Sequence, residues 1–171
     1  MEEQTIVNRV AKSKIETIDL EKLYPTGYRI ALDISQWLYK GFVVKEKEFR
    51  ASLKTHNWEQ YENQYIALYC SNDAIVPEWA YMLITTYLKD YAHKVIYGSL
   101  DKLELLLFSD IINNLDASAY ADKPVIIKGC SEKKIPQNAY IQLVQKLQPV
   151  VKSMMFGEAC SSVPLYKKPR R

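Results

Sequence analysis

The chain has 171 residues, of which 48% are hydrophobic and 25% are charged, a composition typical of a globular protein with a buried core. No apolar run approaches the roughly 20 residues that a membrane helix needs, and the acidic start excludes a secretory signal. We therefore expect a cytoplasmic protein without a membrane partner. The net charge is +3, but four of the 23 basic residues lie in the last five positions. The rest of the chain has 19 basic and 20 acidic residues, which predicts no nucleic-acid partner.

Residues 1–63 are expected to form an N-terminal α/β extension that packs on the rest of a single domain, residues 1–171. The alternation of Ile30, Leu32 and Ile34 predicts a half-buried strand over residues 28–34. Residues 35–56 read as two short helical pieces broken at Gly41, and His56 at the end of the second is expected to cap or pack.

Residues 64–166 alternate short, continuous apolar runs with helical periods. The apolar runs predict strands that are buried on both faces, and each intervening segment repeats its apolar residues at helical spacing. This order predicts an α/β fold with a mostly parallel sheet and right-handed crossovers, followed by a basic tail, residues 167–171. The expected strands are 65–69, 95–97, 125–127 and 154–156, and the expected helices are 80–91, 103–115 and one that begins near Pro136.

The last quarter of the chain repeats an earlier stretch, which predicts two duplicated βαβ units related by an approximate two-fold. Cys130 aligns with Cys70 at an offset of 60, one residue then drops out, and Pro136 aligns with Pro77 at an offset of 59. A third, shorter repeat of the same pattern begins at Cys160. All three cysteines therefore share one context, in which Cys-Ser precedes a β-branched residue and proline.

These cysteines would lie at the carboxyl ends of the predicted strands, where open α/β sheets bind their ligands. Thiolates that converge there need a positive partner, so Cys70, Cys130 and Cys160 predict a shared site for zinc or an iron-sulfur cluster. Their sulfurs should then lie within about 4 Å of one another. The expected cofactor contacts are Gly129 and Gly157, which would allow close backbone approach, and the serines that follow the cysteines, Ser71, Ser131 and Ser161.

Asp101 is the position that the offset of 59 pairs with Cys160. A carboxylate is an acceptable zinc ligand, so the repeat makes Asp101 a candidate fourth ligand. The competing role is a helix cap, because Ser99-Leu-Asp101 opens a predicted helix, and we favour the cap.

Two other classes of function remain open. Free cysteines are small and often buried, so the three thiols could be structural parts of a non-catalytic interaction module. A thiol-dependent enzyme is the third reading, although the sequence identifies no catalytic residue. The usual nucleotide-binding and hydrolase motifs are absent from the sequence.

Three segments carry a family resemblance, namely Asp73-Ala-Ile-Val-Pro-Glu-Trp-Ala-Tyr-Met-Leu, Ile127-Lys-Gly-Cys-Ser and Phe156-Gly-Glu-Ala-Cys-Ser-Ser-Val-Pro-Leu-Tyr-Lys. The chain resembles the bacterial domain-of-unknown-function 2480 family over nearly its whole length. The family has no established activity, but its genes tend to lie near those of iron-sulfur cluster assembly. The resemblance therefore implies a metal or cluster role for the cysteines and a protein partner in that assembly, and a homo-oligomer is possible. Ala159 departs from the proline expected in many relatives.

Overall fold

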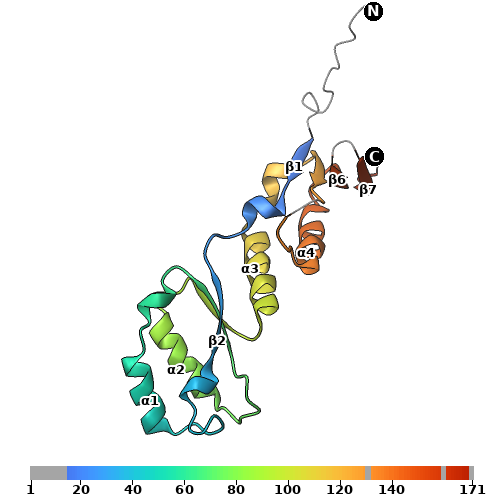
Figure 1. Cartoon of the computed structure of the whole chain (residues 1–171). Coiled ribbons are helices and arrows are strands. Elements are labelled where there is room, and N and C mark those ends of the chain that lie inside the picture. The colour runs from blue at the N-terminus through green and yellow to red at the C-terminus, as the bar shows by residue number, and fades with distance from the viewer. Residues whose placement is uncertain (1–14, 130–131, 159–160, 170–171) are drawn as a thin grey trace, which may run out of the picture. The chain divides into compact units, whose positions relative to one another are not determined.

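The computed structural model describes residues 15–129, 132–158 and 161–169 (Figure 1). The chain forms two compact units, each with its own sheet and its own hydrophobic core. We name residues 25–106 the central unit, and residues 1–24 together with 107–171 the terminal unit. None of the helices within the described ranges is long and apolar enough to cross a membrane.

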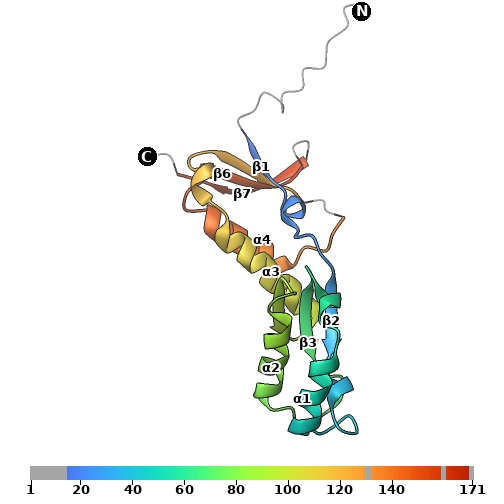
Figure 2. The same ribbon diagram turned by 90° about the vertical axis from the view of Figure 1, so that its left-hand side faces the viewer.

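The central unit is built on a three-stranded parallel sheet in the order β2-β3-β4. The middle strand is the continuous apolar run Ile66-Ala67-Leu68, which is buried on both faces as parallel strands usually are. Figure 2 shows the helices α1 and α2 alongside β2 and β3. The elements are β2 (Arg29–Asp33), η2 (Ile34–Trp37), α1 (Glu46–Thr55), η3 (Glu59–Tyr61), β3 (Tyr65–Tyr69), α2 (Glu78–Leu88) and β4 (Lys94–Tyr97).

The core of the central unit follows from helical spacing. Phe49 and Leu53 stand one turn apart on α1 and are fully buried, as are Ile84 and Leu88 on α2. These two helix stripes meet the apolar side chains of the sheet, so both crossover helices contribute to one core.

The terminal unit carries a four-stranded sheet in the order β1-β5-β6-β7, in which only the last pair is antiparallel. The helix α4 supplies Leu143 and Leu147 to a core that also contains Phe108 and Ile112. The boundary between the two units falls within α3. The elements are β1 (Glu16–Ile18), η1 (Leu20–Leu23), α3 (Leu100–Asn114), η4 (Ala117–Tyr120), β5 (Pro124–Ile127), α4 (Gln137–Leu147), β6 (Ser153–Glu158) and β7 (Ser161–Lys167).

The predicted α/β class with mostly parallel strands is confirmed, but the strands lie in two sheets. Each sheet has an N-terminal strand of its own, since β1 pairs with β5 in one sheet and β2 pairs with β3 in the other. The expected division at residue 63 therefore does not coincide with the two units. The strands β1 and β7 were not predicted, because β1 is only three residues long and β7 is an exposed edge strand that contains Pro164.

The segment from α1 to β4 is repeated by the segment from α3 to β6 at a constant offset of 59 residues across the described positions. Leu68 pairs with Tyr97 in one sheet, and Ile127 pairs with Phe156 in the other, so both strand pairs have the same register. The earlier alignment of Cys130 with Cys70 at an offset of 60 is therefore wrong. The residue that the offset of 59 pairs with Cys70 is Gly129.

Backbone details support the same equivalence. Asn63 and Asp122 both have positive φ, at 58° and 53°. Their N–H groups donate to the carbonyls of Tyr91 and Val150, which are also 59 residues apart, and both hydrogen bonds measure 2.9 Å. The predicted duplication is thus present and extends back to α1, since Phe49 and Phe108 are equivalent. The approximate two-fold between the units stays a prediction.

Candidate functional site

The structure places Cys70 directly after β3, half-buried against the core of the central unit. Cys130, Ser131 and Cys160 lie outside the described residues. Their chain neighbours Gly129 and Ser161 belong to the terminal unit, whereas Cys70 belongs to the central unit. The strands that precede Cys70 and Cys130 are therefore in different sheets and do not share the single sheet edge that the sequence predicted.

Gly129 and Gly157 lie at the close backbone approach that the sequence suggested. A Cβ atom at Gly129 would be 3.0 Å from the ring of Phe156 and 3.4 Å from Cα of Gly157. Gly157 has a φ of 124°, and its Cβ would be 2.5 Å from the carbonyl oxygen of Ser161. The close approaches at both positions and the positive φ of Gly157 favour glycine there, and a cofactor contact stays a prediction.

Ser71 takes part in a polar corner organised by Asp33. The Asp33 Oδ1 atom accepts the N–H groups of Ser35 and Ser71 at 2.9 and 3.1 Å, and the two serine hydroxyls are 3.2 Å apart. Burial raises the pKa of Asp33, but the hydrogen bonds from Ser71 and Ser35 outweigh it and hold the pKa below its usual value. The carboxylate therefore joins the start of η2 to the loop that follows β3.

Asp19 is the equivalent residue in the terminal unit, because the preceding Ile18 pairs with Ile127 of β5 as Leu32 pairs with Leu68 of β3. Its Oδ1 atom accepts the Glu21 N–H at 3.0 Å, and its Oδ2 atom accepts from Lys128 Nζ at 3.1 Å. Burial raises the pKa of Asp19, but the hydrogen bonds from Lys128 and Glu21 outweigh this effect and hold the pKa below its usual value. Each unit thus uses an aspartate after its first strand to cap a 3-10 helix.

Asp101 lies in the first turn of α3, where Ser99 Oγ accepts the N–H of Lys102 at 3.2 Å. The equivalence between the units ends at Gly98 and Gly157, because a helix follows the first and a hairpin follows the second. Cys160 lies outside the described residues, so its pairing with Asp101 stays a prediction. The described residues contain no group of three or more His, Cys, Asp or Glu side chains that could hold a metal ion, and metal binding by the cysteines stays a prediction.

Each unit has a pocket at the carboxyl end of its strands, beside the start of the helix α2 or α4. The terminal-unit pocket measures about 470 Å³ and the central-unit pocket about 390 Å³. The two pockets are equivalent, because five lining positions correspond at the offset of 59. The pairs are Val76 and Ile135, Glu78 and Gln137, Tyr81 and Tyr140, Met82 and Ile141, and Tyr97 and Phe156.

Each pocket has an aromatic pair of its own as one wall. The rings of Tyr81 and Tyr97 are 4.9 Å apart at 70°, and those of Tyr140 and Phe156 are 5.8 Å apart at 85°. These edge-to-face pairs fix the side chains between helix and sheet. Burial, together with Tyr97 and Cys70, raises the pKa of Tyr81 to about 12, so its phenol is neutral at physiological pH.

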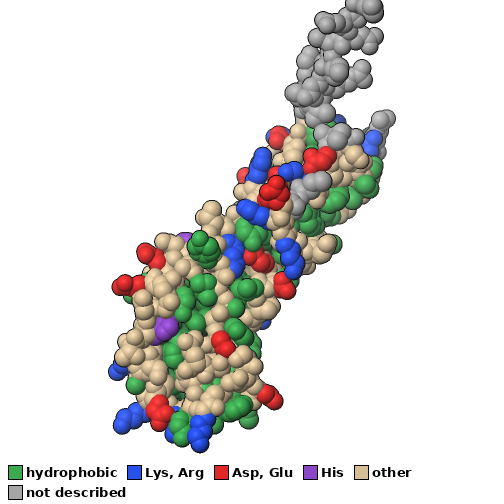
Figure 3. Space-filling model, viewed as in Figure 1, with side chains coloured by type: hydrophobic (Ala, Val, Ile, Leu, Met, Phe, Trp, Pro, Cys, Tyr) green, Lys and Arg blue, Asp and Glu red, His purple; other side chains and the backbone are tan. Residues whose placement is uncertain are grey.

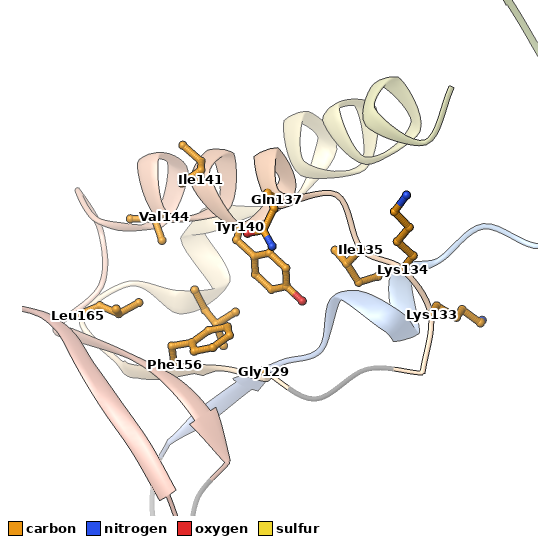
Figure 4. Close-up of a pocket in the computed structure, with 11 residues that line it drawn as sticks. Gly129, Lys133, Lys134, Ile135, Gln137, Tyr140, Ile141, Val144, Phe156 and Leu165 are labelled. Atoms are coloured by element: carbon orange, nitrogen blue, oxygen red, sulfur yellow. The ribbon is translucent and has the colours of Figure 1, made fainter. Parts of the chain in front are cut away.

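The two pockets differ in charge. Glu78 lines the central-unit pocket, whereas its equivalent Gln137 is neutral. Lys133 and Lys134 line the terminal-unit pocket, and the equivalent residues of the central unit are Ala74 and Ile75. Figure 4 shows Tyr140 and Phe156 in the middle of the terminal-unit pocket, with Val144 and Leu165 at one end and both lysines at the other.

These pockets were not predicted from the sequence, because the predicted site was centred on the cysteines. Tyr81 and Tyr140 occupy matching helix positions in the sequence, where aromatic residues are more often part of a core. A gapless alignment at an offset of 59 would have placed Lys133 opposite Ala74 and Gln137 opposite Glu78. That alignment was the available signal for two sites of different charge.

Comparison with known proteins bears out the resemblance. A family model described as "Protein of unknown function (DUF2480)" matches residues 4–168, which is nearly the whole chain. No curated protein and no solved structure matches the chain. The chain therefore belongs to the DUF2480 family of proteins of unknown function.

Proposed function

We propose that this protein is a binding protein whose terminal-unit pocket holds a small organic anion with an apolar body. The observation that carries the proposal is the change of charge between equivalent pockets. The terminal unit keeps the aromatic and aliphatic wall, has Gln137 where the central unit has Glu78, and adds Lys133 and Lys134 at the mouth.

The lining suits such a ligand along its whole length. Val144, Phe156 and Leu165 offer apolar contact to the body of the ligand, and burial of that surface favours binding. The lysine ammonium groups attract a carboxylate, sulfonate or phosphate at the opposite end (Figure 4). A volume of about 470 Å³ lies within the usual range for pockets that bind small molecules.

The test uses 1-anilinonaphthalene-8-sulfonate, an aromatic anion whose fluorescence rises in apolar surroundings. We expect saturable binding to the full chain, and the double variant Lys133→Gln/Lys134→Gln should weaken it about three- to tenfold, because each exposed charge contributes modestly. The matched control is Lys152→Gln/Lys167→Gln, which removes two exposed lysines of the same unit outside the pocket.

Two further results decide where the anion binds. Met82→Gln alters only the central-unit pocket and should leave the affinity unchanged. Equal weakening in both lysine double variants would indicate a general charge effect, and no change in the Lys133/Lys134 variant would contradict the proposal.

A further inference from the structure

We infer that the central-unit pocket is a second binding site, and that it takes an organic cation whose ammonium group carries alkyl substituents. This inference does not depend on the anion in the terminal unit, since it rests on different residues. It follows from an aromatic corner, an available carboxylate and exposed aliphatic side chains that surround one pocket of about 390 Å³.

The aromatic corner consists of Tyr81 and Tyr97. The face of a tyrosine ring attracts cations, and a neutral phenol leaves that attraction intact without adding a titrating charge. The Tyr97 ring already faces one cation of the protein, since Lys102 Nζ is 5.7 Å from its centroid. The residue Tyr97 is 61% exposed, so it also has surface to offer a ligand.

The carboxylate is that of Glu78 in the first turn of α2. It is exposed and forms no hydrogen bond or ion pair with any residue in the described part of the chain. The first turn of α4 has no acidic residue, so the equivalent pocket lacks this charge. A ligand cation would therefore be the counter-ion of Glu78 beside the aromatic corner.

The aliphatic side chains make the site suitable for alkylated ammonium groups. Several hydrophobic side chains of the central unit reach the surface (Figure 3), and Met82 is 67% exposed beside Glu78. Ile75 precedes the lining residue Val76 and is 94% exposed. Methyl or methylene groups on a cation would bury this surface, whereas a strongly hydrated metal ion would not.

Such a cation can be a free small molecule or a methylated lysine side chain of a partner protein. The shared chemistry is the alkylated ammonium group. The experiment therefore compares choline with a short peptide that carries trimethyl-lysine, and with 3,3-dimethylbutan-1-ol as the neutral isostere of choline. Binding is measured from the methyl NMR signal of Met82 in the full chain.

We expect choline to bind at least about threefold more tightly than its neutral isostere, which is the range of an exposed cation–π contact. Glu78→Gln and Tyr97→Leu should each weaken choline about threefold, whereas Glu62→Gln, at an exposed glutamate outside the pocket, should not. If the peptide binds much more tightly than choline, the natural ligand is a protein side chain, and the reverse order indicates a small molecule.

Equal affinity for choline and the neutral alcohol would overturn the inference and leave only an apolar pocket. So would unchanged choline binding in Glu78→Gln. Both changed side chains are exposed, so the variants should remain folded, and the fluorescence of the central unit checks this. None of these variants alters the terminal-unit pocket, so either proposal can fail without the other.

Discussion

Cys70 and Gly129 are 59 residues apart, and the difference between them shows how one position packs differently in the two units. At Gly129 the backbone lies against the Phe156 ring, where a Cβ atom would be only 3.0 Å away. In the central unit the same position carries a thiol that packs on the core beside Tyr81. A cysteine in this place is readily explained by packing, whichever other role it has.

His56 provides a prediction at the level of one residue. Its ring stacks on Tyr61, lies edge-on to Trp58, and its Nε2 atom is 3.0 Å from the Tyr61 hydroxyl. Burial lowers the pKa of His56 below its usual value, so the folded state favours the neutral imidazole. The stability that depends on this preference is present above about pH 6.5 and is lost as the pH falls through the lowered pKa.

Urea unfolding between pH 7.5 and 5 measures this effect. All three tryptophans lie in the central unit, so tryptophan fluorescence reports on that unit. We expect the free energy of unfolding to decrease toward pH 5, and His56→Gln should reduce this pH dependence. His93→Gln is the control, since His93 is exposed. A pKa of His56 above 6.5, measured by NMR, would contradict the explanation.

At the scale of the elements, Asp33 connects three segments of the central unit. It caps η2 through the Ser35 N–H and holds the loop after β3 through the Ser71 N–H. Asp33→Ala should therefore destabilise the central unit by about 1–2 kcal/mol, the usual cost of losing such a cap. Urea unfolding followed by tryptophan fluorescence measures the change.

The matched control for this prediction is Asp90→Ala, which removes an exposed aspartate after the end of α2. Its effect should stay within about 0.5 kcal/mol, as for most surface substitutions. Asp33→Asn should be milder than Asp33→Ala, because an amide oxygen still accepts one N–H group. Equal stability of Asp33→Ala and the unchanged protein would show that the carboxylate does not hold these segments.

The elements that the sequence predicted are those whose own periodicity is strong. The buried run of β3 and the stripe Ile84 and Leu88 of α2 needed no knowledge of their partners. The division into two sheets depended instead on β1, whose three residues carry no pattern. The pockets were missed for a related reason, since the significance of Lys133 appears only beside its equivalent Ala74. Pairing between distant residues is what a single sequence states least clearly.

At the scale of the whole molecule, metal binding by Cys70, Cys130 and Cys160 stays a prediction. Metal analysis of protein purified without oxygen, compared with the triple variant Cys70→Ser/Cys130→Ser/Cys160→Ser, tests it directly. A shared site predicts about one zinc ion or one cluster per chain, lost in the triple variant. Cys70→Ser alone should remove most of that metal if all three thiols share the site.

Two results would contradict the shared site. Equal metal content in the protein and in the triple variant would leave the thiols without a metal role. Full metal content in Cys70→Ser would mean that Cys70 of the central unit does not belong to the same site as the other two cysteines. The anion and cation tests use other residues, so they do not depend on this result.

The insertion of one unit within the other has a consequence for the order in which the chain can fold during synthesis. The central unit is complete at residue 106, whereas β1 must wait for β5, which begins at Pro124, and β6 ends only at Glu158. At roughly 5–20 residues per second, the last of these strands emerges about 3–10 s after the central unit. The strand β1 therefore stays unpaired until β5 emerges, after the central unit is complete, and until then its edge is open to a chaperone or to a neighbouring chain.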